Sequence, residues 1–182
     1  MPPIVIGIGG CSSSGKTTLA SWLARCYKKP VVISLDKFYL MEDNPKLEKV
    51  IPELNMFNYD HISAFDVRAI VRAVKDAIRK ESIDLVVVEG IVVFEIPSLQ
   101  DFFTRKYFLK LDSEEFKRRR KLRVYPGAPD CDKYVENFVW PGYLHFLDGA
   151  QNQEKMVFLD STYLTLEQMF SIIKRDLPQE SH

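Results

Sequence analysis

A glycine-rich stretch near the beginning of the chain has the residue types and spacing of a phosphate-binding loop. Residues 10–17 read G-C-S-S-S-G-K-T and satisfy G-x-x-x-x-G-K-[ST] at every fixed position. Glycines in such a loop let backbone N–H groups turn inward around phosphate oxygens, and the N-terminus of the following helix adds partial positive charge. Lys16 is expected to reach the β- and γ-phosphates of a nucleotide, and the Thr17 hydroxyl to hold Mg²⁺. The residues expected to surround the phosphates are Gly10, Ser12, Ser13, Ser14, Gly15, Lys16, Thr17 and Thr18.

Two carboxylates follow two other apolar runs of the chain. Asp36 lies just beyond Val31–Ile33, and Glu89 follows Leu85–Val88 directly. Since ligands of an α/β sheet bind at the carboxyl ends of its strands, both acids are expected beside the phosphate loop. One carboxylate can then help to hold Mg²⁺ while the other accepts a proton from a hydroxyl nucleophile. Asp36 is the candidate base and a candidate metal ligand, and Glu89 is the candidate metal partner; the alternative is that both are solvated acids at strand ends.

A basic segment with helical spacing is the third feature that points to chemistry. Residues 117–123 hold six cations in seven positions, and Arg119 and Arg120 each share a helix face with Arg123. Such a run is more often a solvated helix face. Near a phosphate loop, however, an arginine that closes over the transferred phosphoryl group raises the rate by about 10³–10⁵. We therefore interpret residues 117–130 as a small basic lid, with Arg120 among the candidate catalytic residues.

The elements that must position these residues can be read from the hydrophobic pattern. Short runs rich in β-branched residues predict buried strands, and longer stretches with helical periodicity lie between them. This alternation predicts an α/β fold with a five-stranded parallel sheet flanked by helices. Ser63 and Asp66 resemble a variant capping box, as do Asp112 and Glu115, whereas residues 37–58 are expected to be a long loop with at most a short helix. The predicted strands are Ile4–Ile8, Val31–Ile33, Leu85–Val88, Tyr107–Leu111 and Met156–Leu159, and the predicted helices are Lys16–Tyr27, Ser63–Lys80, Ser113–Arg123, about 132–152, and Thr165–Leu177.

Length and composition restrict the classes of protein that fit. The 182 residues predict a single domain, with 46% hydrophobic residues and 25 basic side chains balanced by 25 acidic ones. A net charge of zero argues against a protein that mainly neutralises nucleic acid. The sequence predicts neither a secretory signal nor a membrane-spanning segment, and the wide spacing of its three cysteines argues against a zinc site. We expect no membrane partner, a cytoplasmic location with the nucleus as an alternative, and a monomer or weak homodimer.

The motifs taken together resemble nicotinamide riboside kinases, which belong to the uridine-kinase-like group of P-loop kinases. The resemblance runs over nearly the whole chain, and the arginine lid followed by V-W-P at residues 139–141 is its most distinctive part. Residues 58–66 are also similar to uridine kinases. The segments that carry the resemblance are residues 9–18, 33–39, 58–60, 88–90, 118–125 and 139–144.

The resemblance implies a phosphoryl transfer from ATP to the 5′-hydroxyl of nicotinamide riboside, which forms nicotinamide mononucleotide in a salvage step of NAD biosynthesis. Nicotinic acid riboside is an additional candidate substrate. It also implies that Asp36 accepts the hydroxyl proton, that Asp60 and Arg120 hold the riboside, and that Tyr59 and Tyr125 sandwich the base. Lys37 stands where the family commonly has a second acid. The implied substrate-binding residues are Asp36, Phe38, Tyr39, Tyr59, Asp60, Arg120, Tyr125 and Pro126, and those implied to face ATP outside the phosphate loop are Arg119, Arg123, Tyr163, Leu164 and Thr165.

The chemistry of the base agrees with this substrate. Nicotinamide riboside carries a pyridinium cation, and each tyrosine face that stacks on it contributes about 0.5–2 kcal/mol through cation–π attraction. A neutral uracil would instead need polar groups matched to its edge. Ordinary aromatic packing is the alternative for Tyr59 and Tyr125, and Trp140 is expected in the core. Uridine/cytidine kinase and a nucleotide-dependent switch or RNA-binding protein are the other functions considered.

Overall fold

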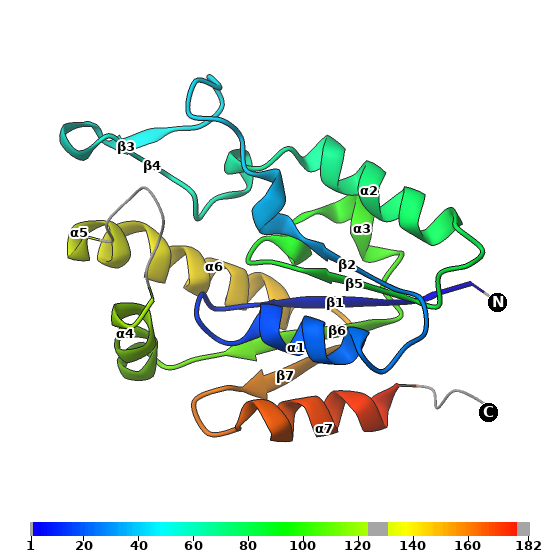
Figure 1. The fold of residues 1–182 in the computed structure, drawn as a ribbon. Coiled ribbons are helices and arrows are strands. Elements are labelled where there is room, and N and C mark those ends of the chain that lie inside the picture. Colours follow the sequence, from blue (N-terminus) through cyan, green and yellow to red (C-terminus); the bar gives the residue numbers. More distant parts are fainter. Residues whose placement is uncertain (1, 124–130, 178–182) are drawn as a thin grey trace.

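The computed structural model describes residues 2–123 and 131–177, which form a parallel five-stranded sheet covered by helices (Figure 1). The order of strands is β2-β5-β1-β6-β7, so the strand that leads into the phosphate loop lies in the middle. Ile8 of this strand is paired with Glu89 on one side and Tyr107 on the other. The predicted five-stranded parallel sheet is confirmed, with shifts of at most two residues at the strand ends. The strands are β1 (Ile4–Gly10), β2 (Pro30–Ser34), β5 (Leu85–Glu89), β6 (Arg105–Lys110) and β7 (Met156–Asp160).

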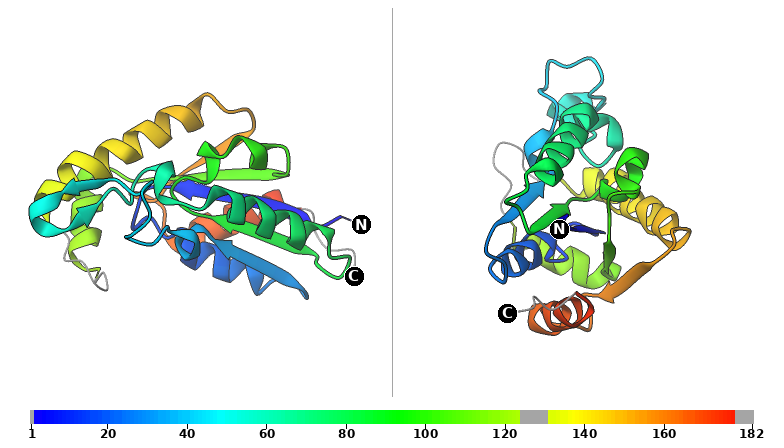
Figure 2. Two further views of the ribbon diagram at one scale, coloured as in Figure 1. Left: turned by 90° about the horizontal axis from the view of Figure 1, so that it is seen from above. Right: turned by 90° about the vertical axis from the view of Figure 1, so that its right-hand side faces the viewer.

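Helices cover both faces of the sheet, as the two views in Figure 2 show. Side chains of successive strand residues point to opposite faces, which divides the core into two clusters. Val87 packs with the cluster of α1 and α7, whereas Val86 and Val88 pack with that of α2 and α6. Burial on both faces explains why the central strand β5 is apolar from Leu85 to Val88, whereas the edge strands β2 and β7 each expose one apolar residue, Val32 and Phe158. The helices are α1 (Lys16–Ala24), α2 (Val67–Arg79), α3 (Pro97–Gln100), α4 (Ser113–Lys121), α5 (Asp132–Tyr134), α6 (Trp140–Gln151) and α7 (Leu166–Asp176).

The carboxyl ends of the strands all lie at one end of the molecule, on the left in Figure 1. There the basic helix α4 lies beside the phosphate loop, to which its Arg120 side chain donates a hydrogen bond. Residues 132–151 form one continuous helical segment, as expected, but residues 135–139 are a π-helix between α5 and α6. Pro141 explains the wider turn because its ring clashes with the carbonyl four residues earlier, and Trp140 N–H bonds to Val135 O instead. In the part of the chain that the structure describes, no helix is long and apolar enough to cross a membrane.

The structure corrects the prediction for residues 37–58, which contain an antiparallel strand pair and not only a loop. The strands β3 (Lys49–Ile51) and β4 (Met56–Phe57) pair with each other and, within the described residues, with no other strand. A short 3₁₀-helix, η1 (Leu35–Phe38), precedes them. Ile51, Met56 and Phe57 bury this pair against the core. Strands of three and two residues are too short to show an alternating pattern in the sequence.

The start of α2 is also corrected. Its N-cap is Asp66, whose Oδ1 accepts a hydrogen bond of 2.9 Å from the Ala69 N–H. Ser63 lies instead in a 3₁₀ turn and donates its N–H to His61 Nδ1. Phe65, between the two, is extended, so the helix cannot begin earlier. The predicted first residue, Ser63, therefore lies about one turn before the actual N-cap, Asp66.

Glycines in β1 allow an aromatic ring to lie directly on the sheet. A Cβ built on Gly9 would lie 2.6 Å from the ring of Phe94, and one on Gly7 would lie 2.8 Å from it. Phe94 is buried, and its ring also contacts Phe103 edge-on at 5.8 Å between centroids. Both glycines thus leave room for the Phe94 ring to pack against β1, next to the phosphate loop that follows.

We expect Gly9→Ala to destabilise the protein by about 1–3 kcal/mol, because the added methyl group forces the Phe94 ring from its place. Chemical denaturation measures this free energy of unfolding. Gly149→Ala is the matched control: its Cβ would meet only the flexible end of Glu95, and alanine favours the helix by about 1 kcal/mol. Equal stability of Gly9→Ala and the wild type would contradict the described packing.

Candidate active site

The phosphate loop connects β1 to α1 and is shaped by close contact with β6. Cys11 N–H donates to Leu109 O at 3.1 Å, and a Cβ on Gly10 would collide with the Leu109 backbone. Gly10 has a φ of 127° and Ser13 has a φ of 63°, so the backbone turns sharply at both positions. The loop ends at Gly15, the N-cap of α1, and its N–H groups therefore lie at the positive end of a helix.

Lys16 lies across this loop with its ammonium group almost out of contact with solvent. Its Nζ donates to Gly10 O at 3.1 Å and to Cys11 O at 2.7 Å. Burial lowers the pKa of Lys16, and the carboxylates of Glu89 and Asp36 act in the opposite direction. The ammonium is thus held at the point where the nucleotide phosphates are expected.

Thr17 and Glu89 come together as the metal prediction requires. The Thr17 hydroxyl donates to Glu89 Oε1 at 3.2 Å, and Glu89 is only 2% exposed at the end of β5. Across residues 2–123 and 131–177 no three His, Cys, Asp or Glu side chains form a metal cluster. Mg²⁺ usually takes one or two carboxylates and completes its shell with phosphates and water, so this donor set fits a nucleotide-bound Mg²⁺.

The phosphate loop itself also fits an anion. The hydroxyl of Ser13 is buried and has no hydrogen-bond partner among the described residues. A buried polar atom of this kind costs free energy unless a ligand or water completes it. Burial raises the pKa of the Cys11 thiol to about 12, so this side chain stays protonated near neutral pH.

Asp36 lies in η1, immediately after β2, at the same sheet edge as the phosphate loop. Its carboxylate is exposed, yet its charge acts on the buried ammonium of Lys16. It therefore stands near the phosphates while remaining accessible to a second substrate. The following residues Phe38 and Tyr39 are half-buried, and Tyr39 contacts the Tyr59 ring edge-on at 5.4 Å between centroids.

The basic helix α4 sends its arginines to different partners. Arg120 is buried, and its Nη1 donates to Ser12 Oγ in the phosphate loop at 3.1 Å. Arg118 instead pairs with Glu115 at 2.6 Å on the outer side. Arg123 is exposed, and its charge reaches Lys16. Arg120, one of the three arginines predicted to share helix faces, thus contacts the phosphate loop directly. Tyr125 and Pro126 lie outside the described residues.

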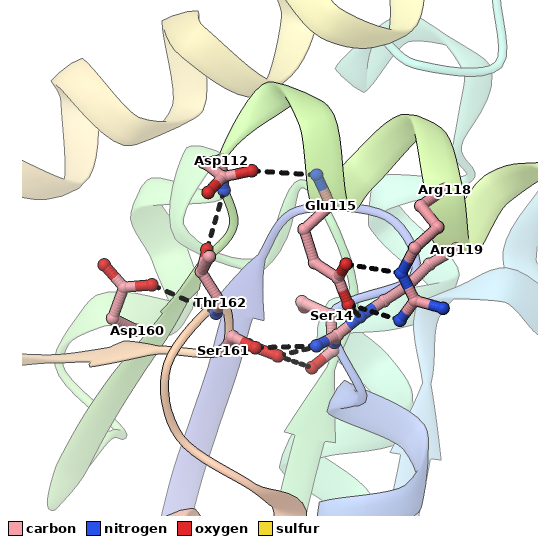
Figure 3. A network of polar contacts seen from close by, with 8 residues as sticks. All are labelled: Ser14, Asp112, Glu115, Arg118, Arg119, Asp160, Ser161 and Thr162. Atoms are coloured by element: carbon pink, nitrogen blue, oxygen red, sulfur yellow. Dashed lines mark hydrogen bonds and ion pairs between the residues drawn. The ribbon is translucent and has the colours of Figure 1, made fainter.

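Ser161 joins the arginine helix to the phosphate loop, a role that the sequence did not reveal. Its Oγ accepts from Arg119 Nη1 at 2.7 Å and donates to Ser14 O at 2.9 Å, and its carbonyl accepts from Arg119 Nη2 at 2.7 Å (Figure 3). Glu115 holds the remaining side of the same guanidinium at 2.6 Å. Arg119 is therefore held beside the loop by Glu115 and Ser161.

Glu115, in the first turn of α4, supports this position of Arg119. Hydrogen bonds from Arg118 and Arg119 lower the pKa of Glu115 to about 2, so its carboxylate stays ionised near neutral pH. Asp112 Oδ1 caps the helix by accepting from the Glu115 N–H at 2.8 Å. The predicted capping box is only half formed, because the Glu115 side chain turns to the arginines and the Asp112 N–H donates to Thr162 Oγ1.

The segment after β7 is the one that the family resemblance implies for contact with adenine. It contains Ser161 and therefore follows directly from the contact with the phosphate loop. Tyr163 is 81% exposed, Thr165 caps α7, and Leu164 is half-buried between them. An exposed aromatic ring next to a phosphate site offers a surface on which a purine can stack.

The expected nucleoside side is built from residues 58–60 and from the helical segment after residue 131. Tyr59 packs against Tyr39, and Asp60 accepts a hydrogen bond from the Tyr134 hydroxyl at 2.8 Å. Tyr134 was not predicted, and no motif marks it. Trp140 packs between Phe116 and Tyr143, with centroids 5.2 and 5.0 Å away, which agrees with its expected place in the core.

We expect Ser161→Ala to raise the KM for the nucleotide by roughly tenfold, since a buried hydrogen bond to a charged group contributes about 1.5–3 kcal/mol. Steady-state kinetics with varied nucleotide measures the effect. Thr162→Val is the matched control, because it removes a hydroxyl that bonds to the start of α4 but not to Arg119. Equal KM values for the two variants would show that Ser161 does not position Arg119.

Comparisons with known proteins identify related kinases. No family model matches the chain. Nicotinamide riboside kinase 1 of Mus musculus is 33% identical over 194 residues, with 99% of this chain and 96% of that protein covered. The human enzyme of the same name is 32% identical and covers 99% of this chain and 94% of its own. A uridine kinase of Oceanobacillus iheyensis is more distant, at 24% identity with 96% of each chain covered.

Solved structures share the fold at lower identity. A sugar kinase from Janibacter sp. HTCC2649 superposes with a TM-score of 0.65 at 18% identity, covering 96% of this chain and 94% of that one. Thymidylate kinase from Candida albicans gives 0.61 at 14% identity, with 96% and 91% covered. These likenesses show a P-loop kinase fold. With the identity to the curated relatives over almost its full length, they show that this chain is a nucleoside kinase that belongs to the nicotinamide riboside kinase family.

Proposed function

We propose that the protein transfers the γ-phosphoryl group of ATP to the 5′-hydroxyl of nicotinamide riboside and forms nicotinamide mononucleotide, a salvage step of NAD biosynthesis. The observation that carries the proposal is the position of Asp36, an accessible acid whose charge reaches the buried Lys16 of the phosphate loop. The relatives named nicotinamide riboside kinases, which cover 99% of this chain, support the choice of substrate.

In this mechanism Asp36 is the proton acceptor. As the 5′-oxygen bonds to the γ-phosphorus, its O–H bond breaks and the proton passes to the Asp36 carboxylate. The bond from phosphorus to the bridging oxygen breaks, and ADP leaves with that electron pair. Because such a transition state needs little covalent chemistry from the protein, positioning of the two oxygens is the main task of the site.

Charge that develops during the transfer is stabilised by groups already in place. Lys16 and the loop N–H groups face the phosphates, and Arg120 contacts the loop at Ser12. Mg²⁺ supplies further neutralisation on the β- and γ-phosphates when it is bound, and Thr17, Glu89 and Asp36 are the residues that would hold it, directly or through water. Since Lys37 follows Asp36, no second acid contributes at that position.

Two neighbouring aromatic side chains, Tyr39 and Tyr59, form an aromatic wall that supports a nucleoside with a cationic nucleobase. The Tyr59 hydroxyl donates to Glu42 Oε1 at 3.4 Å, and burial together with this carboxylate raises the pKa of Tyr59. A negative charge beside two electron-rich ring faces attracts a pyridinium and offers nothing specific to a neutral uracil. Nicotinic acid riboside, whose carboxylate would approach Glu42, is the weaker substrate in this proposal.

A direct comparison of substrates tests the proposal. We expect kcat/KM for nicotinamide riboside to exceed that for uridine and cytidine by at least roughly tenfold, because each aromatic contact with the cation contributes about 0.5–2 kcal/mol. A coupled assay of ADP release with each nucleoside measures these values. A higher kcat/KM for uridine would replace the proposed substrate with the alternative, a uridine/cytidine kinase.

A substitution tests the assignment of Asp36 as the general base. We expect Asp36→Asn to lower kcat by about 10²–10⁴, the usual range for loss of a general base, while the Kd for ATP stays close to that of the wild type. Single-turnover kinetics and nucleotide titration measure the two quantities. Asp43→Asn is the control, since Asp43 is an exposed acid of the following loop. Unchanged turnover of Asp36→Asn would remove Asp36 from the role of base.

A further inference from the structure

A buried tyrosine hydroxyl connects the helical segment after residue 131 to the expected nucleoside site. Tyr134 is 3% exposed, and its hydroxyl makes two hydrogen bonds to consecutive residues of a distant segment. The Tyr59 N–H donates to it at 2.9 Å, and Asp60 Oδ2 lies 2.8 Å away. Both partners are implied substrate residues, but Tyr134 itself has no place in the mechanism so far.

The directions of these two hydrogen bonds follow from their chemistry. A backbone N–H can only donate, so the hydroxyl oxygen accepts from Tyr59. Its single proton is then left for Asp60, whose carboxylate accepts it. Burial and the nearby Asp60 charge raise the pKa of Tyr134, so the hydroxyl keeps this proton at any working pH. One oxygen of Asp60 is thus held in a constant orientation.

Asp60 is also confined on its backbone side. A Cβ on Gly142 in α6 would lie 3.0 Å from Asp60 O, so the helix backbone approaches the acid closely. The Tyr134 ring stacks on Phe138 at 5.5 Å between centroids and 27° between planes, which restricts its rotation. The helical segment therefore holds Asp60 through a side chain at its beginning and through a glycine nearly two turns later.

The acid held in this way lies close to the phosphate loop and to the basic helix. The charges of Asp60 and Arg120 both act on the buried Cys11 of the loop, and Arg120 also acts on Tyr134. A ribose whose 5′-oxygen meets the phosphates would present its other hydroxyls a few ångströms further on. An ionised carboxylate can accept from both hydroxyls of a vicinal diol while one of its oxygens also accepts from a tyrosine.

We propose that Tyr134 is a positioning residue for the nucleoside, which orients the Asp60 carboxylate toward the ribose hydroxyls. The inference rests on the proposed function in one respect, that the acceptor is a riboside. It does not depend on which base the riboside carries. Tyr134 acts through Asp60 and touches no reacting atom. We therefore expect removal of its hydroxyl to weaken the affinity for the riboside without changing the rate of the chemical step.

Tyr134→Phe removes the hydroxyl and keeps the ring. We expect the KM for nicotinamide riboside to rise by roughly tenfold, with kcat and the KM for ATP within about twofold of the wild type, as for loss of one charge-assisted hydrogen bond. The matched control is Tyr143→Phe, because Tyr143 is also buried and its hydroxyl accepts a hydrogen bond from the Leu111 N–H, with no other partner in the part of the chain that the structure describes. A similar rise in the riboside KM for both variants would overturn the positioning role.

A substrate lacking one ribose hydroxyl separates positioning from general stability. The wild type is expected to lose affinity for the 2′-deoxy or the 3′-deoxy analogue, whereas Tyr134→Phe and Asp60→Asn lose much less on the same change. If Tyr134→Phe loses as much as the wild type for both analogues, Tyr134 does not act through the ribose and the inference fails.

The same set of variants and deoxy analogues distinguishes a failure of the inference from a failure of the proposed function. If the wild type phosphorylates uridine and not nicotinamide riboside, the proposed substrate is wrong, and uridine with its deoxy analogues tests Tyr134 in the same way. If Asp60→Asn weakens riboside binding but Tyr134→Phe does not, the function stands and the inference is overturned. If no riboside is phosphorylated, both are overturned.

Discussion

The buried ammonium of Lys16 is the interaction on which the rest of the site depends. A lysine taken out of water loses hydration that the protein must replace, or its charge is lost. Here two carbonyl groups of the loop accept from Nζ, and the carboxylates of Glu89 and Asp36 supply the opposing charge. The loop, the end of β5 and the end of β2 must therefore meet at one point. A parallel sheet with β1 between β5 and β6 brings about this meeting, because all its carboxyl ends lie on one side.

The same requirement explains why the basic helix is tied to the loop by contacts within the protein itself. Arginines that are free to move would lose conformational entropy when they close on the phosphates. Arg120 is already bonded to Ser12, and Arg119 is held between Glu115 and Ser161. Much of the charge needed for phosphoryl transfer is thus arranged in advance, as electrostatic preorganisation requires. Glu115 neutralises part of this charge, which limits the repulsion among six cations in seven residues.

The nucleoside side is organised by another principle, the packing of one helical segment against a short polar one. Tyr134 and Gly142 hold Asp60 from the segment that follows the basic lid, and the aromatic side chains of residues 39 and 59 form a wall beside it. The β3–β4 pair supports this wall through Phe57, whose ring lies 6.3 Å from that of Tyr59. The residues proposed to bind phosphate thus lie on loops after strands, whereas those proposed to bind the nucleoside lie on elements added to the sheet.

The sequence by itself determined the sheet, the phosphate loop and the acids at the strand ends. These features are local: a strand with two buried faces is continuously apolar, and the spacing of glycines and lysine in the loop is read within eight residues. Only the tertiary structure decided that Ser161 joins Arg119 to Ser14, that Tyr134 orients Asp60, and that β3 pairs with β4. The hydroxyl contacts join residues 147 and 74 positions apart. Serine and tyrosine have no distinctive local pattern, so their partners are set by the packing of the whole chain.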